Sequence, residues 1–333
     1  MDLSINYLGF KLPHPFMPGA SPLCDNLAGV RKLEDAGAAA IVLRSLFEEQ
    51  LVSEELATAR ATEGVAQCSA EATSYFPTQD KFVLGPNEYL EHIRKVKQAV
   101  KIPVIASLNG TTDGGWLSYA KQIQDAGADA LELNVYYVAV DPDEAGKDIT
   151  ERMIKMVASV KKSLRIPLAV KMSPFFSSPA NVAKQLVGAG ANGLVIFNRF
   201  YQPDIDTENL EVTPSLSLSH SGALLPRLRY LAVFSERIKA DLAVTGGVHT
   251  CLDAVKAIMC GANAVQLVSV LLERGVGQIA KLRDELAAWL EKHEYESLKQ
   301  MHGSMNLMKC PDPRAFERAN YMHVLQSWRG ASL

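Results

Sequence analysis

No run of eighteen or more apolar residues occurs in the sequence, so no segment is predicted to cross a bilayer as a helix. The N-terminus, Met1 to Asn6, has neither the basic start nor the apolar stretch of a signal peptide. The five cysteines form no Cys-x-x-Cys pair and are odd in number, which argues against a disulfide framework or a zinc site. The seven histidines show no metal-ligand spacing. We therefore expect a soluble, cytoplasmic protein without a metal.

An excess of charge of either sign is also missing. The 34 basic and 37 acidic residues leave a formal charge of -3, which gives no reason to expect nucleic acid as a partner. Hydrophobic residues make up 48% and charged residues 21%, an ordinary globular composition. The 333 residues suit one large barrel with insertions, or two ordinary domains.

What the sequence does contain is a repeated pattern in which a helical stretch ends at a glycine and an apolar run follows. It occurs at Gly37, Gly127, Gly190 and Gly261. Glycine is the usual residue for a left-handed helix C-cap, and the apolar runs suit strands that are buried on both faces. Two more strands begin at Ile102-Pro103 and Ile166-Pro167, where a proline at the strand start costs little.

The whole chain reads as eight alternating strand and helix units. Strands are predicted near 15–18, 39–43, 103–107, 129–133, 167–171, 193–197, 242–245 and 264–268. Helices are predicted near 26–36, 87–99, 115–126, 150–163, 179–189, 225–239, 250–259 and 276–292. This alternation favours an α/β fold, a (β/α)8 TIM barrel. A doubly wound sheet is the alternative, although no Gly-x-Gly-x-x-Gly follows the first strand.

Three connections, about 44–86, 134–149 and 198–224, are too long for simple turns. All follow strands, so they lie at the carboxyl face where barrel active sites form, and we interpret them as lids rather than surface decoration. We predict a single domain over 1–333. Its helical tail, about 293–333, is apolar enough to pack on the barrel or to form a subunit contact.

Two adjacent loops predict a phosphate site. Gly246 and Gly247 follow the seventh strand, and Ser269 follows the eighth and leads into a helix. Glycine lets backbone amides approach an anion, a helix N-terminus adds a favourable dipole, and Ser269 adds a hydroxyl donor. The alternative is a tight turn and a helix cap without a ligand.

Polar side chains end several of the predicted strands. Lys171 and Arg44 lie at the carboxyl ends of the fifth and second strands, and Asn109, Asn134 and Asn198 close the third, fourth and sixth. A lone asparagine there is usually a turn former, and a lone lysine is often paired with a carboxylate. Together they indicate donors and acceptors that converge on a polar, planar ligand such as a flavin, whose anionic reduced form a cation would stabilise.

Several motifs resemble those of the dihydroorotate dehydrogenase family. They occur in the family's order over about residues 3–292, and the opening segment Ile5 to Pro15 resembles the hairpin that plugs the floor of that family's barrel. The motifs are Phe16-Met17-Pro18-Gly19-Ala20-Ser21, Ile105-Ala106-Ser107-Leu108-Asn109-Gly110, Glu132-Leu133-Asn134, Val170-Lys171-Met172-Ser173-Pro174, Thr245-Gly246-Gly247 and Cys260-Gly261-Ala262-Asn263-Ala264-Val265-Gln266-Leu267.

The resemblance implies FMN as the cofactor and, by resemblance alone, a homodimer or a higher homo-oligomer. It places Lys171 and Asn134 near the ring and ribityl chain, with Asn198 beside them, and we count Asn109 among the cofactor-binding residues. Along the flavin edge it places Ala20, Ser21 and Ser45, and at the phosphate end Gly222, Gly246, Gly247 and Ser269.

The substrate half departs from the family pattern. Tyr137 stands where the family has a Cys or Ser general base, and a phenol with a pKa near 10 is a poor base at neutral pH. Arg44 replaces the family lysine on the second strand and cannot give up its proton. The family's Asn-Ser after the sixth strand reads Asn198-Arg199. These changes spare the residues that would hold FMN.

Our leading hypothesis is an FMN-dependent oxidoreductase that passes hydride between a substrate carbon and flavin N5. Arg44 and Lys171 would support the developing flavin charge, with Tyr137 as acid or base. Conversion of dihydroorotate to orotate, in pyrimidine biosynthesis, is the family default. The alternatives are an FMN oxidoreductase for another small-molecule substrate, a non-catalytic flavin-binding electron-transfer subunit, and a phosphosugar-type lyase or isomerase. The hypothesis also allows for a redox partner protein.

Overall fold

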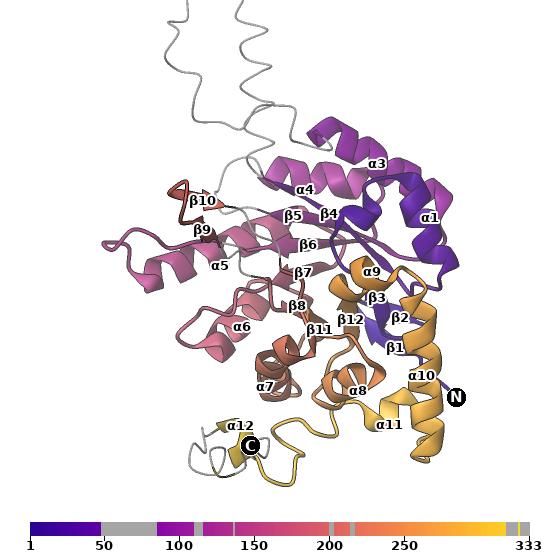
Figure 1. The fold of residues 1–333 in the computed structure, drawn as a ribbon. Coiled ribbons are helices and arrows are strands. Elements are labelled where there is room, and N and C mark those ends of the chain that lie inside the picture. Colours follow the sequence, from indigo (N-terminus) through magenta and orange to yellow (C-terminus); the bar gives the residue numbers. More distant parts are fainter. Residues whose placement is uncertain are drawn as a thin grey trace, which may run out of the picture.

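The computed structural model describes residues 1–47, 85–109, 116–135, 137–199, 203–213, 217–317 and 326. Its central feature is a sheet of eight parallel strands (Figure 1). They are β3 (Phe16–Pro18), β4 (Ile41–Phe47), β5 (Val104–Asn109), β6 (Ala130–Asn134), β7 (Leu168–Lys171), β8 (Gly193–Ile196), β11 (Asp241–Thr245) and β12 (Ala264–Leu267).

The order of these strands around the sheet follows the chain and then returns to its start. The last strand, β12, pairs in parallel with the first, β3, and the Ala39 amide before β4 donates to the Phe16 carbonyl of β3 at 3.0 Å. The sheet therefore closes on itself, as in a TIM barrel. The doubly wound alternative is wrong, because that fold reverses its strand order part-way across an open sheet.

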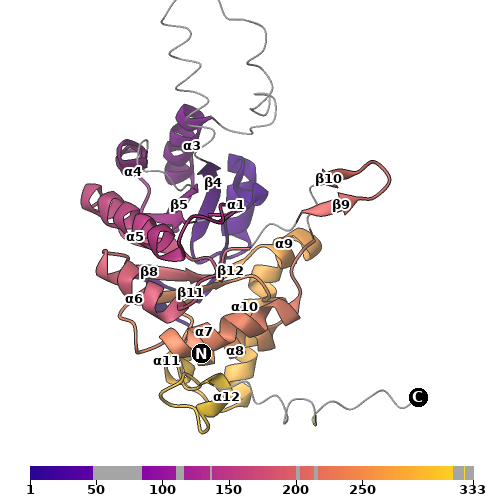
Figure 2. The ribbon, with the colours of Figure 1, turned by 90° about the vertical axis from the view of Figure 1, so that its left-hand side faces the viewer.

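Helices follow the strands and cover the outside of the barrel (Figures 1 and 2). They are α1 (Leu27–Asp35), α3 (Pro86–Ala99), α4 (Trp116–Asp125), α5 (Gly146–Ser163), α6 (Pro179–Gly188), α7 (Leu225–Phe234), α8 (Cys251–Met259), α9 (Ser269–Arg274) and α10 (Gln278–Lys292). The predicted boundaries differ most at α5, which begins one turn early, and at α7, which ends at Phe234 because Ser235 leaves the helical region and Glu236 has a φ of 63°.

The four repeated glycines have the backbone conformation that the sequence predicts. Gly37, Gly127, Gly190 and Gly261 have φ values of 87°, 100°, 106° and 112°. At Gly261 a Cβ atom would lie 2.2 Å from the Ser235 hydroxyl, so a side chain is also excluded by packing. Each glycine reverses the chain from a helix into the next barrel strand.

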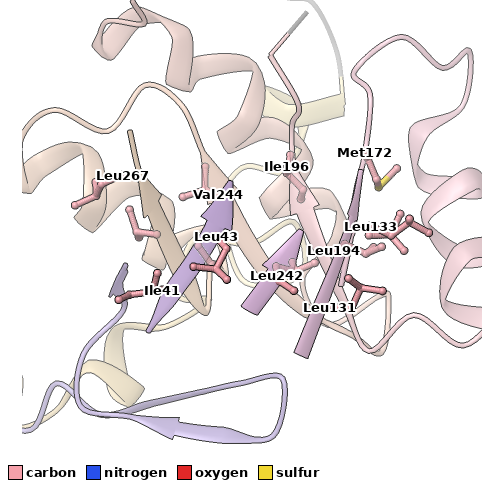
Figure 3. Close-up of a cluster of buried hydrophobic side chains, with 14 of the residues drawn as sticks. Ile41, Leu43, Leu131, Leu133, Met172, Leu194, Ile196, Leu242, Val244 and Leu267 are labelled. Atoms are coloured by element: carbon pink, nitrogen blue, oxygen red, sulfur yellow. The ribbon is translucent and has the colours of Figure 1, made fainter. Parts of the chain in front are cut away.

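The strands bury both of their faces, which divides the core in two. Side chains such as Leu131, Leu133, Leu194 and Ile196 point outward and pack against the helices (Figure 3). The alternate positions point into the barrel and form a second cluster that includes four small alanines, Ala130, Ala169, Ala243 and Ala264.

The small interior residues leave room for an N-terminal hairpin. Strands β1 (Ile5–Tyr7) and β2 (Phe10–Leu12) pair antiparallel, and Tyr7, Leu8 and Leu12 belong to the interior cluster. The Leu8 amide donates to the Asp241 carboxylate at 2.7 Å, which ties the hairpin to the start of β11. The hairpin therefore closes the amino-terminal end of the barrel, as the resemblance implied.

Long connections lie at the other end. The connection after β6 covers 135–145, and the one after β8 carries a second hairpin, β9 (Asp204–Asp206) with β10 (Glu211–Thr213), which projects from the body of the molecule (Figure 2). Most of the predicted connection over 44–86 lies outside the described residues.

The tail packs on the barrel through α11 (Leu298–Met301) and as far as α12 (Arg314–Glu317), whose Phe316 packs against the outer core. Leu298 and Met301 are fully buried, and the Leu298 amide donates to the Asp2 carbonyl at 2.9 Å. The Leu307 amide likewise donates to the Ala232 carbonyl of α7 at 2.9 Å. Within the described residues we find no helix with the length and hydropathy needed to span a membrane.

Candidate active site

A polar layer lies above the apolar interior of the barrel, toward its carboxyl end. Ser107 on β5, Glu132 on β6, Lys171 on β7 and Gln266 on β12 are all buried. Each follows an interior alanine or isoleucine by two residues along its strand, so by alternation its side chain points into the barrel. The sequence places charged and amide groups where a barrel usually has aliphatic side chains.

The centre of this layer is a buried ion pair. The Lys171 ammonium lies 3.3 Å from Glu132 Oε1, and the two side chains are 9% and 0% exposed. Gln266 Nε2 donates to the other carboxylate oxygen, Oε2, at 2.6 Å. Because β6 and β12 lie on different sides of the barrel, this hydrogen bond crosses its interior. The ion pair predicted as the alternative for Lys171 therefore exists, and it lies inside the mouth.

Two buried amide oxygens of this region, Asn134 Oδ1 and Gln266 Oε1, have no hydrogen-bond partner in the described part of the chain. The same holds for the Ser21 hydroxyl, which follows β3, and for the Tyr7 hydroxyl of the N-terminal hairpin. A buried acceptor without a partner costs free energy of about 1–3 kcal/mol, so such groups usually mark the position of a ligand or a water molecule. A ligand that suits this place would donate N–H groups to the two amide oxygens and would carry negative charge beside the ammonium.

The predicted asparagines form part of a row across the strand ends. Asn109 is the register partner of Asn134, and Asn134 is the register partner of Lys171. The Asn198 amide donates to the Met172 carbonyl at 2.8 Å, which places it next to the end of β7. The structure thus brings together four of the five residues that the sequence predicted to converge, and the fifth, Arg44, lies on β4.

The second strand contributes a serine and an arginine with different surroundings. The Ser45 hydroxyl lies 2.7 Å from the Ser107 hydroxyl, within the polar layer. The β4–β5 register shifts between Val42 and Ser45, so Arg44 lies in an irregular part of the strand. Its guanidinium pairs with Asp25 Oδ2 at 2.7 Å, which offsets its charge. Lys171 is also paired, but it is 9% exposed against 37% for Arg44, and so it is the stronger candidate for a cation beside a buried ligand.

The predicted phosphate loops come together at the other side of the mouth. Gly246 and Gly247 have φ values of 81° and 87°, and a Cβ atom on Gly247 would lie 2.4 Å from the Leu224 amide nitrogen. This contact holds the Gly-Gly turn against η3 (Ser221–Leu224), which contains Gly222. The Ser269 hydroxyl accepts from the Ser219 amide at 3.1 Å. The loops after β8, β11 and β12 therefore meet at one place.

Sequence reasoning missed Ser219, which links these loops. Its hydroxyl lies 2.9 Å from the Ser269 hydroxyl and accepts from the Gly247 amide at 3.2 Å. It also lies 3.3 Å from His249 Nε2. A single serine in a loop carries no sequence signal, so only the tertiary structure identifies it.

A positive group beneath this turn was also missed. Arg227 Nε donates to the Thr245 carbonyl at 2.5 Å, and a Cβ atom on Gly246 would lie 3.1 Å from its guanidinium. Burial lowers the pKa of Arg227 to about 10, and the positive charge of Arg199 acts in the same direction. Among the described residues no carboxylate pairs with Arg227. Arg199 likewise has no ion-pair partner among the described residues, and two such cations favour an anion at this turn.

Tyr137 has a different environment from these groups. Its hydroxyl donates to Glu144 Oε2 at 2.6 Å, Arg152 pairs with Glu144 Oε1 at 2.7 Å, and the Arg152 guanidinium lies 4.9 Å from the tyrosine ring centre. The hydrogen bond to Glu144 raises the pKa of Tyr137 above its ordinary value. A phenol with a raised pKa is a weaker source of the phenolate that a general base requires.

This group borders a cavity of about 700 Å³ on the outer side of the mouth. The cavity lies between α5 and α6, and its lining includes Tyr137, Phe175, Phe176 and Met156. Met156 belongs to the outer core, so the cavity faces the helical layer. We find no cluster of three His, Cys, Asp or Glu side chains suited to a metal in the part of the chain that the structure describes.

Comparison with known proteins identifies the family of this chain. Residues 83–290, more than half of the chain, match the family model described as "Dihydroorotate dehydrogenase". The chain belongs to the dihydroorotate dehydrogenase family. It is therefore a flavin oxidoreductase of this family, whose dehydrogenases act on CH–CH groups, and this argues against the phosphosugar lyase or isomerase.

Individual relatives of the family are distant. The catalytic subunit of "Dihydroorotate dehydrogenase B (NAD(+))" from Thermoplasma volcanium is 25% identical, over 91% of this chain and 98% of its own length. The same subunit from Thermoplasma acidophilum is 27% identical, with the same coverage. "NAD-dependent dihydropyrimidine dehydrogenase subunit PreA" from Escherichia coli K12 is 25% identical, over 92% of this chain and 77% of its own length. At this distance the substrate has to be argued from the site.

Proposed function

We propose that the protein is an FMN-dependent dehydrogenase that acts on a CH–CH group of a small substrate other than dihydroorotate. The observation that carries the cofactor assignment is the pair of unpartnered amide oxygens, on Asn134 and Gln266, beside the buried Lys171 ammonium. The pyrimidine half of a flavin offers N–H groups to such acceptors. When bound, FMN supplies the site that accepts a hydride from the substrate carbon.

The other residues fit the remaining parts of FMN. We assign Lys171, Asn109, Asn134 and Asn198 to the ring and ribityl chain, because they meet at the ends of neighbouring strands. Ala20, Ser21 and Ser45 are assigned to the flavin edge. We assign the phosphate group to Gly222, Gly246, Gly247 and Ser269, supported by the uncompensated charge of Arg227. In this proposal residues 1–333 form one FMN-binding domain.

The proposal of another substrate rests on Tyr137 and Arg44. Dihydroorotate oxidation in this family uses a side-chain base at the position of Tyr137, and here a hydrogen bond ties that phenol to Glu144. Arg44, which replaces the family lysine, is paired with Asp25. Neither group is free to remove a proton from dihydroorotate at neutral pH. We therefore do not assign Tyr137 or Arg44 as acid or base, and Lys171 is the only one of the three predicted catalytic residues that we retain.

A second candidate is dihydroorotate itself, which would place the protein in pyrimidine biosynthesis. The family match and the names of two relatives favour it. Those relatives are named as subunits, which supports a redox partner protein that takes electrons from the reduced flavin. A cytoplasmic location and a homo-oligomer remain predictions.

An anaerobic visible spectrum of the purified protein tests both candidates. We expect flavin absorbance that dithionite bleaches and that dihydroorotate leaves unchanged. Bleaching by dihydroorotate at a rate fast enough for turnover would overturn our substrate proposal and support the second candidate. Absence of flavin, together with no binding of added FMN, would overturn the cofactor assignment.

A further inference from the structure

Glu132 is the carboxylate of the polar layer, and it contacts two candidate FMN ligands at once. One carboxylate oxygen faces the Lys171 ammonium at 3.3 Å, and the other accepts from Gln266 at 2.6 Å. Its side chain is 0% exposed, so water does not screen it. The function proposed above gives Glu132 no role.

The geometry points to Glu132 as a positioning residue that sets how strongly the site favours reduced over oxidised FMN. This inference rests on the proposed FMN site. Glu132 does so in two ways: it offsets part of the Lys171 charge, and it determines which atom of the Gln266 amide faces the ligand.

The charge effect follows from burial. An ammonium beside the flavin pyrimidine stabilises the anion that forms on reduction. A carboxylate within 3.3 Å of that ammonium opposes the effect, and at this burial the two charges act on a ligand almost as a dipole. Glu132 therefore holds the reduction potential of the bound flavin below the value that Lys171 alone would produce.

The orientation effect follows from the chemistry of the amide. An ionised carboxylate only accepts hydrogen bonds, so the Gln266 NH2 group must face Glu132. Gln266 Oε1 then points elsewhere, where it is buried without a partner in the described residues. An amide in place of the Glu132 carboxylate has a donor and an acceptor, so the Gln266 amide would no longer be held in one orientation.

The structure provides a matched control directly below this layer. Burial raises the pKa of Tyr7 well above its ordinary value, and the charge of Glu132 contributes in the same direction, which places the phenol near the carboxylate. The Tyr7 hydroxyl has no hydrogen-bond partner among the described residues. Tyr7→Phe therefore perturbs packing near Glu132 without changing a charge or a hydrogen bond.

The test is the reduction potential and the FMN dissociation constant of the wild type, Glu132→Gln and Tyr7→Phe, each loaded with FMN. We expect Glu132→Gln to raise the preference for reduced over oxidised FMN about tenfold, a shift of about 30 mV upward for a two-electron couple. Tyr7→Phe should keep the wild-type potential. An unchanged or lowered potential in Glu132→Gln would overturn the inference, as would an equal rise in Tyr7→Phe.

Glu132→Asp gives a second measurement if Glu132→Gln does not fold. The shorter aspartate side chain keeps the charge but moves the carboxylate away from Gln266 and Lys171. Because the Gln266 amide is then no longer held in one orientation, oxidised FMN should bind about tenfold more weakly. Unchanged affinity would count against the positioning role. A wild-type protein that binds no FMN would instead defeat the proposed function, so the two failures are distinguishable.

Discussion

At the scale of single residues, the two ion pairs near the mouth differ in their exposure to solvent. Lys171 and Glu132 are enclosed, so their interaction is strong and a ligand beside them senses both. Arg44 pairs with Asp25 at 37% exposure, where solvent weakens the interaction. This difference explains why Lys171 is retained as the cation of the site.

Tyr137→Phe tests the residue that stands at the family's base position. We expect the rate of flavin reduction by the true substrate to fall by less than about threefold, because the hydroxyl is already bound by Glu144; loss of a general base costs about 10²–10⁴. Anaerobic stopped-flow absorbance measures this rate. Glu144→Gln, which weakens the same hydrogen bond from the other side, is the control. A hundredfold loss in Tyr137→Phe alone would restore Tyr137 as acid or base.

At the scale of elements, the proposed phosphate site depends on how closely the loop after β11 approaches η3. Gly247 combines a left-handed backbone with a position where a Cβ atom would collide with the Leu224 backbone. Glycine at this position therefore permits both the left-handed turn and the close approach of the loop to η3.

Gly247→Ala should weaken FMN binding at least tenfold and lower stability by about 1–3 kcal/mol, since the collision moves the loops apart. Fluorescence titration of the apoprotein with FMN measures the affinity, and urea unfolding measures the stability. Gly275→Ala is the control, because Gly275 has a similar φ of 84° and open space around its Cβ position. Equal FMN affinity in both variants would contradict the assignment of the loop to the phosphate.

The start of α8 is tied to the same region through Asp253. Its Oδ2 accepts from the His249 and Thr250 amides at 3.0 and 2.9 Å, and from the Ser221 hydroxyl at 2.7 Å. Burial raises the pKa of Asp253, but hydrogen bonds from Ser221, His249 and Thr250 outweigh it and leave the pKa below its ordinary value.

A lowered carboxyl pKa adds stability above the unfolded pKa of about 4, and that stability is lost as the pH falls through the folded pKa. We therefore expect Asp253→Asn to be about 1–2 kcal/mol less stable than the wild type at pH 7. The difference should shrink as the pH falls from about 4 toward the lower folded pKa, because over this range the unfolded chain takes up a proton that the folded carboxyl does not. Urea unfolding of both proteins from pH 7 to pH 3 measures it, and a constant difference over this range would refute the explanation.

At the scale of the whole molecule, the N-terminal hairpin and the described part of the C-terminal tail both pack on the barrel. The N-terminal hairpin fills the amino-terminal end, and the segment around Leu298 binds the Asp2 backbone. The tail thereby holds the chain that leads into the hairpin.

Leu298→Ala should lower the free energy of unfolding by about 2–5 kcal/mol, because Leu298 is fully buried in the outer core. Urea unfolding followed by circular dichroism and by tryptophan fluorescence measures it, and the two transitions should coincide if the tail unfolds with the barrel. Leu252→Ala, at a side chain that is 54% exposed, should change stability by less than about 0.5 kcal/mol. Separate transitions would show that the tail unfolds independently.

The local features of this protein were determined by its sequence. The helix-ending glycines, the apolar runs after them and the prolines at strand starts predicted all eight barrel strands to within a few residues, because these signals depend on backbone conformation and alternation along a short segment. Boundaries failed at α5 and α7, where no local signal marks the first or last turn. Lys171, Asn109 and Asn134 were predicted to converge because parallel strands end at one face of a barrel.

Only the tertiary structure decided which groups face one another across the barrel. Glu132 meets Gln266 from a strand 134 positions away in sequence, and Ser219, Arg227 and the Glu144–Tyr137 pair gain their meaning from contacts between elements. Side-chain contacts at such separations depend on closure of the sheet and on its register. The sequence by itself thus determined a barrel whose strand ends carry polar side chains suited to a flavin. Closure of the sheet decided which of these charges interact, because that interaction depends on distance and burial rather than on residue type.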